Sequence, residues 1–247
     1  MLAEISYYEW FQETWPKFSD RLENYLPYAW PLLDEFIKGC QETLYMLGIT
    51  IVFAGFFGIV LGVLMVLVKS KGILACPSIY RILEVIVNLF RSIPFIILLA
   101  LLVPITRMIV KTSIGPTAAT VPIIVGTIPF FARQVEIALL EVKPGVIEAA
   151  LAMGASPWDI VYRVYLREGL VALLRVSAST VINVLGLTVM AGAVGAGGLG
   201  TIAISRGYQR SRMDVILVAT FLILVIVFIS QLIFNVLIKI FDHSKSE

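Results

Sequence analysis

The sequence predicts an all-α integral membrane protein with five transmembrane helices. Of its 247 residues, 59% are hydrophobic and only 15% are charged, whereas roughly a quarter are charged in soluble domains. The mean hydropathy of +0.94 agrees with this class. The net charge of +2 gives no indication of a nucleic-acid partner, and none is expected.

Four uncharged runs are each long enough for one span, because crossing the hydrocarbon core takes roughly 20 residues. They are Thr43–Val68, Thr112–Ala132, Val176–Ser205 and Val215–Ile238. A fifth span is expected within Ile82–Val103, which Glu84 and Arg91 interrupt. We expect Pro77–Phe90 to enter obliquely from the interface and the span to be completed after Pro94.

Residues 1–39 are predicted to form an extracellular or interfacial tail. The segment carries several acidic residues and no apolar core run, so it does not have the pattern of a signal peptide. It holds three of the four tryptophans, Trp10, Trp15 and Trp30. Aromatic and charged residues in alternation are typical of a membrane interface. The alternative is a partly ordered tail with no function of its own.

The Lys and Arg residues favour an orientation with the N-terminus outside and the C-terminus in the cytoplasm. The inner segments then carry more of them than the outer loops, although Arg206, Arg210 and Arg212 lie on the outer side. The acidic N-terminal tail fits the outer side. The cytoplasmic tail, residues 241–247, contains the only histidine, His243, which we expect to be solvated.

Gly195–Gly200 matches the G-x-G-x-x-G pattern of dinucleotide sites letter for letter. Such a site needs a preceding strand and a following helix, but this stretch ends a long apolar run. The glycines are instead expected to let backbones approach closely or to permit a bend. The sequence contains no G-x-x-x-x-G-K-[ST] loop, no metal-ligand spacing and no catalytic arrangement. We therefore expect any ATP to bind another subunit.

Polar and helix-breaking residues in the spans are candidates for a translocation path or gate. Arg91 and Pro94 near the second span predict either a simple kink with a snorkelling arginine or a gate. Thr180, Asn183 and Met190 lie on the fourth span, where polar groups face protein or a water path because exposure to lipid is costly. Uncharged, mildly polar and thioether groups suit a zwitterionic substrate. Hydrogen bonding between helices is the alternative for each residue.

The segment Glu148–Arg167 is punctuated by polar residues and lies between two hydrophobic blocks. Its first part predicts a short helix with Ala150 and Gly154 one turn apart, and such small residues allow close approach. Ser156 is predicted as an N-cap ahead of a proline, with Asp159 completing a capping box. Two helices would then meet at a sharp corner outside the bilayer and present a docking surface.

This segment resembles the EAA loop of ATP-binding-cassette (ABC) importer permeases, in which EAA, three residues, Gly and nine residues precede Ile-x-Leu-Pro. Val164 stands for the isoleucine, and Arg167 stands where the proline is usual. The resemblance implies that a cytoplasmic loop, about residues 141–168, docks on an ATPase subunit. The residues implied in this coupling are Glu148, Ala149, Ala150, Met153, Gly154, Ala155 and Ser156.

Three further stretches resemble the permease of methionine importers in the ABC family: Asn88–Leu99, Thr112–Gly115 and Ala191–Gly200. The similarity runs from about residue 40 to 240 and implies a type I ABC importer permease fold over this range. It implies a homodimer, two cytoplasmic ATPase subunits holding ATP and Mg, and an extracellular substrate-binding protein that could be a lipoprotein. The chain itself would hold no cofactor, and it would import methionine by alternating access across a bacterial cytoplasmic membrane.

Other functions are weighed against this one. The substrate could be another amino acid or a small zwitterion. An ion-coupled carrier or a self-sufficient channel would need an intramembrane acid or a selectivity constriction, and the uncharged runs offer no midplane Asp or Glu. No internal repeat is evident, which argues against the usual plan of secondary transporters. A membrane adaptor that only docks an ATPase is the remaining alternative.

Overall fold

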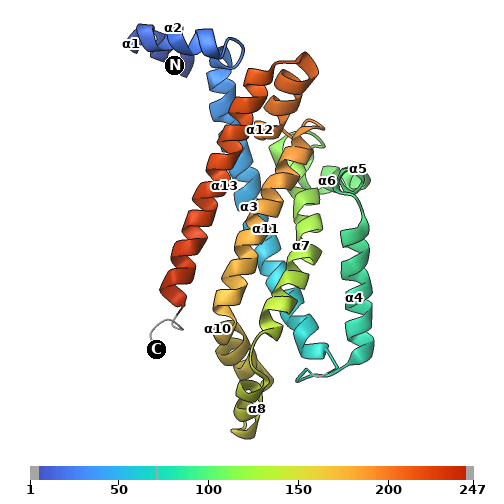
Figure 1. Ribbon diagram of the computed structural model, residues 1–247. Helices are drawn as coiled ribbons and strands as arrows, with labels where there is room; N and C mark the ends of the chain where they lie inside the picture. The colour runs from blue at the N-terminus through green and yellow to red at the C-terminus, as the bar shows by residue number, and fades with distance from the viewer. Residues whose placement is uncertain (1–5, 71, 243–247) are drawn as a thin grey trace.

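The structure, a computed structural model, describes residues 6–70 and 72–242 and is helical throughout, with no strand in this part of the chain (Figure 1). The long helices are α3 (Leu33–Val68), α7 (Pro116–Leu140), α11 (Leu170–Gly192) and α13 (Met213–Phe241). The shorter elements are α1 (Tyr7–Thr14), α2 (Pro16–Tyr25), η1 (Trp30–Leu32), α4 (Pro77–Ser92), α5 (Phe95–Leu101), α6 (Val103–Val110), α8 (Pro144–Ala152), α9 (Pro157–Asp159), η2 (Ile160–Tyr165), α10 (Leu166–Glu168), α12 (Gly198–Thr201), η3 (Ile202–Gly207) and η4 (Tyr208–Arg210).

Four of the described helices are long and apolar enough to cross a membrane, and the bent pair α4 and α5 would make a fifth span if it is counted as one. The uncharged runs predicted at Thr43–Val68, Thr112–Ala132 and Val215–Ile238 are largely contained in α3, α7 and α13. Helix α3 begins at Leu33, so the predicted boundary between tail and domain at residue 40 falls inside a continuous helix.

The run Val176–Ser205 is not one span, contrary to the prediction. Helix α11 ends at Gly192, and a loop precedes the next helix, whose N-cap Gly197 has a φ of +83°. A Cβ atom on Gly192 would lie 2.5 Å from the backbone N of Thr201. The glycines therefore allow the close backbone approach that was predicted, but they do so by interrupting the helix.

The predicted second span is sharply bent. Helices α4 and α5 meet at 100°, with Pro94 as the N-cap of α5. Ile93 adopts an extended conformation, φ −79° and ψ 122°, because the ring of a following proline disfavours the helical region. Helix α4 runs along α7 (Figure 1), but α5 turns away from that direction instead of continuing the span after Pro94.

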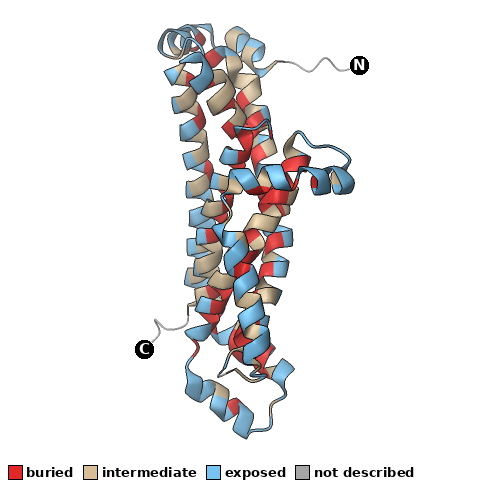
Figure 2. Cartoon of the chain, turned by 90° about the vertical axis from the view of Figure 1, so that its right-hand side faces the viewer, coloured by how far each residue is buried: buried red, intermediate tan, exposed pale blue. Residues whose placement is uncertain are grey.

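The long helices pack around two buried clusters, one in each half of the bundle. One cluster includes Met46, Ile123 and Leu199, and the other includes Val135 and Ile160. Buried residues follow the interior of the bundle while its flanks are exposed (Figure 2). Only 6% of the most apolar stretch of α13 is buried inside the chain, so this helix must be covered by lipid or by another subunit.

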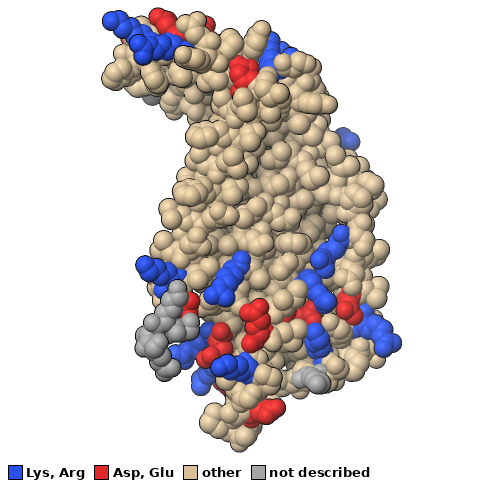
Figure 3. Space-filling model, viewed as in Figure 1, with Lys and Arg blue, Asp and Glu red and all other residues tan. Residues whose placement is uncertain are grey.

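Charged residues gather toward the two ends of the face shown in Figure 3, and a wide band of uncharged side chains lies between them. A band of this kind is expected where a bundle crosses the hydrocarbon core. The two ends of the chain lie at opposite ends of the bundle (Figure 1). We call the end that carries α1 and α2 the upper end, and the end that carries α8 the lower end.

Candidate functional site

The segment after α7 forms a compact loop at the lower end of the bundle (Figure 1). Helix α8 ends at Ala152, and the next residues close it with a Schellman motif: the N–H of Gly154 donates to the Leu151 carbonyl at 2.9 Å, and the N–H of Ala155 donates to the Ala150 carbonyl at 3.1 Å. Gly154 has a φ of +80°, a conformation that glycine adopts without steric cost. The role of Gly154 is therefore to end α8, and it does not share a helix face with Ala150 as the sequence suggested.

The restart of the chain after α8 confirms the predicted capping box. The Ser156 hydroxyl accepts from the N–H of Asp159 at 3.2 Å, and the Asp159 carboxylate accepts from the N–H of Ser156 at 3.3 Å. Hydrogen bonds from the Ser156 hydroxyl and N–H, with a smaller contribution from Arg163, hold the pKa of Asp159 below its ordinary value. The corner between the two helices is thus fixed by backbone and side-chain bonds.

The other side of the loop is seated in the lower core cluster. Ala150 and the residues of the π-helical turn η2 pack there against side chains from α3 and α7, including Val66 and Leu139. The buried members of η2 are Ile160, Val161, Val164 and Tyr165. A loop anchored by this many buried side chains moves with the lower ends of the spans, because a packed interior transmits displacement.

The exposed end of the loop is unusually apolar. Met153 is 82% exposed and Trp158 is 72% exposed, and Leu151 lies exposed near them. Glu148, Ala149 and Ser156 are also exposed, Ala155 is half-buried, and Ala150 is buried. We call Glu148, Ala149, Leu151, Met153 and Trp158 the coupling tip. Large exposed apolar residues on a rigid loop mark a surface that binds another protein.

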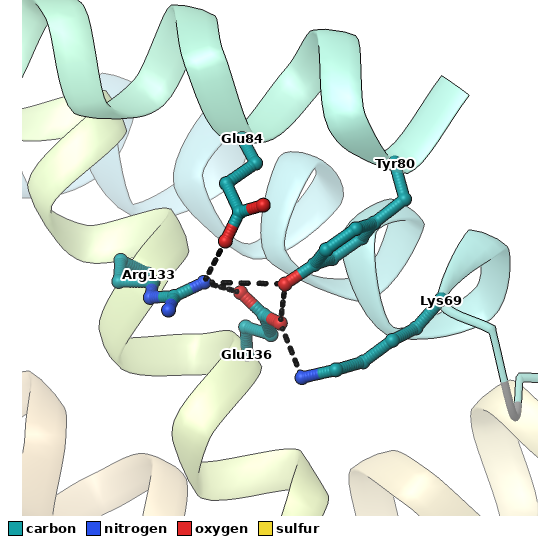
Figure 4. A network of polar contacts seen from close by, with 5 residues as sticks. All are labelled: Lys69, Tyr80, Glu84, Arg133 and Glu136. Carbon is teal, nitrogen blue, oxygen red and sulfur yellow. Dashed lines mark hydrogen bonds and ion pairs between the residues drawn. The ribbon is translucent and has the colours of Figure 1, made fainter. Parts of the chain in front are cut away.

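A polar network joins the end of α3 to α4 and α7 (Figure 4). The Glu136 carboxylate is 1% exposed and accepts from Lys69 at 3.0 Å, from the Tyr80 hydroxyl at 2.9 Å and from Arg133 at 2.7 Å. Arg133 also lies 3.7 Å from Glu84. These residues come from the end of α3, from α4 and from α7, so one buried carboxylate joins three elements.

This network was not predicted from the sequence. Arg133 and Glu136 lie in the last turns of an apolar helix, where an interfacial position is expected, but Glu136 is buried inside the bundle. The sequence signal for the network was the spacing of Arg133 and Glu136, three residues apart in an apolar helix. Charged residues in such a helix pair with one another inside the protein. Partial burial lowers the pKa of Lys69, but its hydrogen bond to Glu136 and the charge of that carboxylate outweigh this and raise it above the ordinary value.

The predicted path or gate residues fall in different places. Arg91 and Asn183 line one hollow of about 280 Å³, together with Phe95 of α5 and Gly126 of α7. Pro94 lies at the bend beside this hollow and is exposed. Thr180 does not line it, and neither does Met190, which is 49% exposed.

Thr180 lines a second hollow of about 340 Å³, between α3, α7, α11 and α13. Its hydroxyl donates to the Val176 carbonyl at 2.7 Å. Thr50, on the same wall, has a buried hydroxyl without a hydrogen-bond partner in the described part of the chain. A buried polar atom of this kind points to a water or ligand in the hollow. The sequence analysis missed Thr50, although a threonine within an apolar span was the available signal.

Among residues 6–70 and 72–242, no group of His, Cys, Asp and Glu side chains could hold a metal ion. His243 lies outside the described residues. The glycine-rich stretch has no preceding strand in this helical fold. The chain therefore combines an exposed apolar loop, a buried network and two hollows in a bundle of helices long enough to span, an arrangement that fits a membrane transport subunit.

The comparisons with known proteins place the chain in a family. Residues 58–246 match the model of the binding-protein-dependent transport system inner membrane component, and the chain belongs to this family. It is 45% identical to the probable D-methionine transport system permease protein MetI of Pasteurella multocida, over 82% of this chain and 93% of the relative. It is 43% identical to the methionine import system permease protein MetP of Bacillus subtilis, over 85% and 95% of the two chains.

A solved structure of inward-facing conformations of the MetNI methionine ABC transporter contains a similar chain. The TM-score is 0.84 at 42% sequence identity, over 86% of this chain and 99% of that one. The chain is thus a multi-pass membrane component of a transporter and not an enzyme in its own right.

Proposed function

We propose that this chain is the permease subunit of an ATP-driven importer of methionine. Two named methionine permeases match it over more than four fifths of its length. The single structural observation that carries the coupling assignment is the coupling tip, an exposed apolar surface on a loop whose other side is buried among the spans. The alternative that changes only the substrate is import of another amino acid or a small zwitterion.

The proposed orientation has five spans, with the N-terminus outside and the C-terminus in the cytoplasm. The support is geometric. A loop that docks a cytoplasmic ATPase must lie inside, and the start of the described chain lies at the opposite end of the bundle (Figure 1). The bent pair α4 and α5 is then counted as the second span.

The proposed assembly has two copies of this chain, two ATPase subunits that hold ATP and Mg, and an extracellular substrate-binding protein. The largely unburied α13 supports contact with lipid or with a second copy. The coupling tip would carry the closure of the ATPase pair into α7, because the lower cluster joins the loop to Val135 and Leu139. The Glu136 network would pass the movement to α4 through Tyr80.

The proposed path includes the two hollows. Arg91, Asn183 and Pro94 would form a gate where α4 bends, and Thr180 would line the path with Thr50. Met190 is exposed and would face the path in the assembled pair. The hollow at the bend carries one cation and one amide, whereas the second hollow is mainly apolar with a few hydroxyls. A path with so few polar groups suits a zwitterion that must pass without being tightly held.

The function is tested by uptake of labelled methionine into proteoliposomes that hold this chain with its ATPase and binding protein, with and without ATP. ATP-dependent uptake that unlabelled methionine competes would support the family mechanism and the substrate. ATP-dependent uptake of another amino acid in place of methionine would overturn the substrate alone. Uptake that needs a proton gradient and no ATP would identify an ion-coupled carrier, and no uptake of any amino acid would identify an adaptor.

The docking assignment has its own test in the same system. Ala149→Trp enlarges the exposed coupling tip without changing backbone geometry, and we expect about a tenfold or greater loss of ATP-driven uptake, because a clash at the centre of an interface prevents seating. Gly154→Trp is less clean because Gly154 has a φ of +80°. Ala75→Trp, an equal change at an exposed position before α4, is the control. Full transport in the Ala149 variant would refute the docking assignment.

A further inference from the structure

The hairpin of α1 and α2, residues 7–25, lies outside the part of the chain that matches the family, which begins at residue 58. It projects sideways from the top of α3 and overhangs the flank of the bundle (Figure 1). The mechanism proposed above leaves it without a role.

The hairpin is held in a fixed pose. The Asp34 carboxylate accepts from the Ser6 hydroxyl at 2.6 Å and from the N–H of Tyr7 at 2.7 Å. The Trp30 indole donates to the Ser19 hydroxyl at 3.0 Å, and its ring packs edge-on to that of Phe11 at 5.2 Å between centroids. Both helices are thus tied to the head of α3, which argues against an unstructured tail.

Helix α1 turns one aromatic side toward the head of α3. Tyr8 and Phe11 face the ring of Trp30. Successive residues are about 100° apart around a helix, so Glu9, Trp10 and Glu13 lie on the side away from Trp30, and Trp10 is exposed there. Helix α1 therefore attaches the hairpin to α3.

Helix α2 gathers its apolar residues on one side. Phe18, Leu22 and Tyr25 are spaced i, i+4 and i+7 and therefore share one side. Phe18 and Tyr25 are exposed, Tyr25 by 81%. Asp20 lies on the opposite side, and Arg21 borders the aromatic one. Trp15, exposed at the junction of the two helices, adds a further aromatic group.

The overhang has a charged upper margin and an uncharged underside (Figure 3). That underside faces the uncharged band of the bundle, which is the surface that lipid covers in a spanning protein. Aromatic side chains with one polar atom are favoured at the boundary between headgroups and acyl chains. A protein partner would approach from the aqueous side, where the charges lie.

We propose that the α1–α2 hairpin is a membrane-interface anchor that lies in the headgroup region of the bilayer at the upper end, with Trp15, Phe18 and Tyr25 at the acyl boundary. Four acidic residues, Glu9, Glu13, Asp20 and Glu23, outnumber Lys17 and Arg21 in the two helices. Attraction to anionic lipids therefore does not drive the contact. Burial of aromatic surface drives it, so neutral lipid suffices and salt leaves it unchanged.

The test uses the full chain in phosphatidylcholine nanodiscs without its partners, so it can fail while the transport assignment stands. Cys40 and Cys76 are replaced by serine, and a fluorophore is attached at Tyr25→Cys. The matched control is Asp20→Cys, on the other side of the same helix. Fluorescence is quenched by nitroxide on the lipid headgroup and, separately, by iodide in the water.

We expect lipid nitroxide to quench the label at position 25 by about twofold or more over the label at position 20, with iodide showing the opposite order. The ratio of lipid quenching at position 25 to that at position 20 should stay the same in about 1 M salt, because salt screens charge interactions and not the burial of aromatic surface. Phe18→Cys should behave as Tyr25→Cys does, which guards against local unfolding at one site. Equal lipid quenching at positions 20 and 25 would overturn the proposal. A second sample contains the binding protein as well. If position 25 is shielded from iodide only in that sample, the proposal is also overturned, because that outcome assigns the surface to a protein.

Discussion

The two ends of the molecule use carboxylates in different ways. At the upper end two carboxylates accept from backbone N–H groups alone: Glu42 from Gly198 at 2.6 Å, and Asp214 from Tyr28 at 2.8 Å and Ala29 at 2.9 Å. Glu35, at the same end, accepts from the Arg206 side chain at 2.9 and 3.0 Å. At the lower end the buried Glu136 accepts from side chains, and two of the three donors are the long side chains of lysine and arginine.

This difference has a mechanical meaning. A carboxylate on a backbone N–H ties two stretches of chain directly, so the stretches separate only if the bond breaks. Lysine and arginine donors can change rotamer and keep their bond while the helices shift. Glu42 and Asp214 thus fix two attachments at the upper end, whereas the Glu136 network at the lower end can rearrange. A joint at the lower end fits the docking role proposed for the coupling tip.

The largest effect is expected from Glu136→Ala. It leaves Lys69 and Arg133 without their buried counter-charge, and we expect a loss of about 3–5 kcal/mol in the free energy of unfolding. Thermal unfolding of the purified chain in detergent measures it. Glu84→Ala is the control, because it removes only a 3.7 Å contact between partly exposed groups and should cost about 1 kcal/mol or less. Similar losses in both variants would mean that Glu136 does not organise the network.

The fixed character of the upper end is tested by Gly192→Ala. The new Cβ would lie 2.5 Å from the N of Thr201 and 2.6 Å from the C of Gly200. Backbone atoms cannot move aside cheaply, so we expect a loss of about 1–3 kcal/mol. Gly186→Ala, in the same helix with open space around it, should instead be neutral or gain up to about 1 kcal/mol. The free energies of unfolding of both variants are measured by denaturation under the same conditions. Equal values for the two would contradict the prediction.

A smaller loss of stability is expected from a change at Gly154, which ends α8 beside the coupling tip. Gly154→Ala places a side chain at a φ of +80° with nothing within 4 Å, so only backbone strain opposes it, at about 1 kcal/mol. Exchange of the Gly154 and Ala155 amides should speed up, because both close the Schellman motif. Gly145→Ala in the first turn of α8 is the control and should not change their exchange. Unchanged exchange in the Gly154 variant would count against the motif.

The smallest effect is a pH dependence of the capping box. The pKa of Asp159 lies below its ordinary value of 3.8, so its bonds with Ser156 stabilise the corner above that pH and are lost as the pH falls through the lowered pKa. Exchange of the Asp159 amide, corrected for intrinsic rates, should therefore rise only in that acid range. Ser156→Ala should remove this pH step and lower the protection a few-fold at neutral pH. A step that survives in the variant would have another origin.

Some elements could be read from local patterns. Ser156 and Asp159 have the spacing of a capping box, and the structure has that box. The apolar runs predicted as spans lie in α3, α7 and α13, each of which is long and apolar enough to cross a membrane. Both features depend on residues a few positions apart, so periodicity and capping rules suffice for them. The break after Gly192 could not be read in this way, because it depends on how closely Gly200 and Thr201 approach α11.

The sequence by itself determined the membrane class, most of the spans, and a capped loop between hydrophobic blocks, because hydropathy and caps act over short stretches of chain. Only the tertiary structure decided that Glu136 is buried among Lys69, Tyr80 and Arg133, and that Asn183 lines one hollow with Arg91 while Thr180 lines another. Those positions depend on helices far apart in the chain. The bend at Pro94 and the packing against α7 bring them together, and no local rule contains that information.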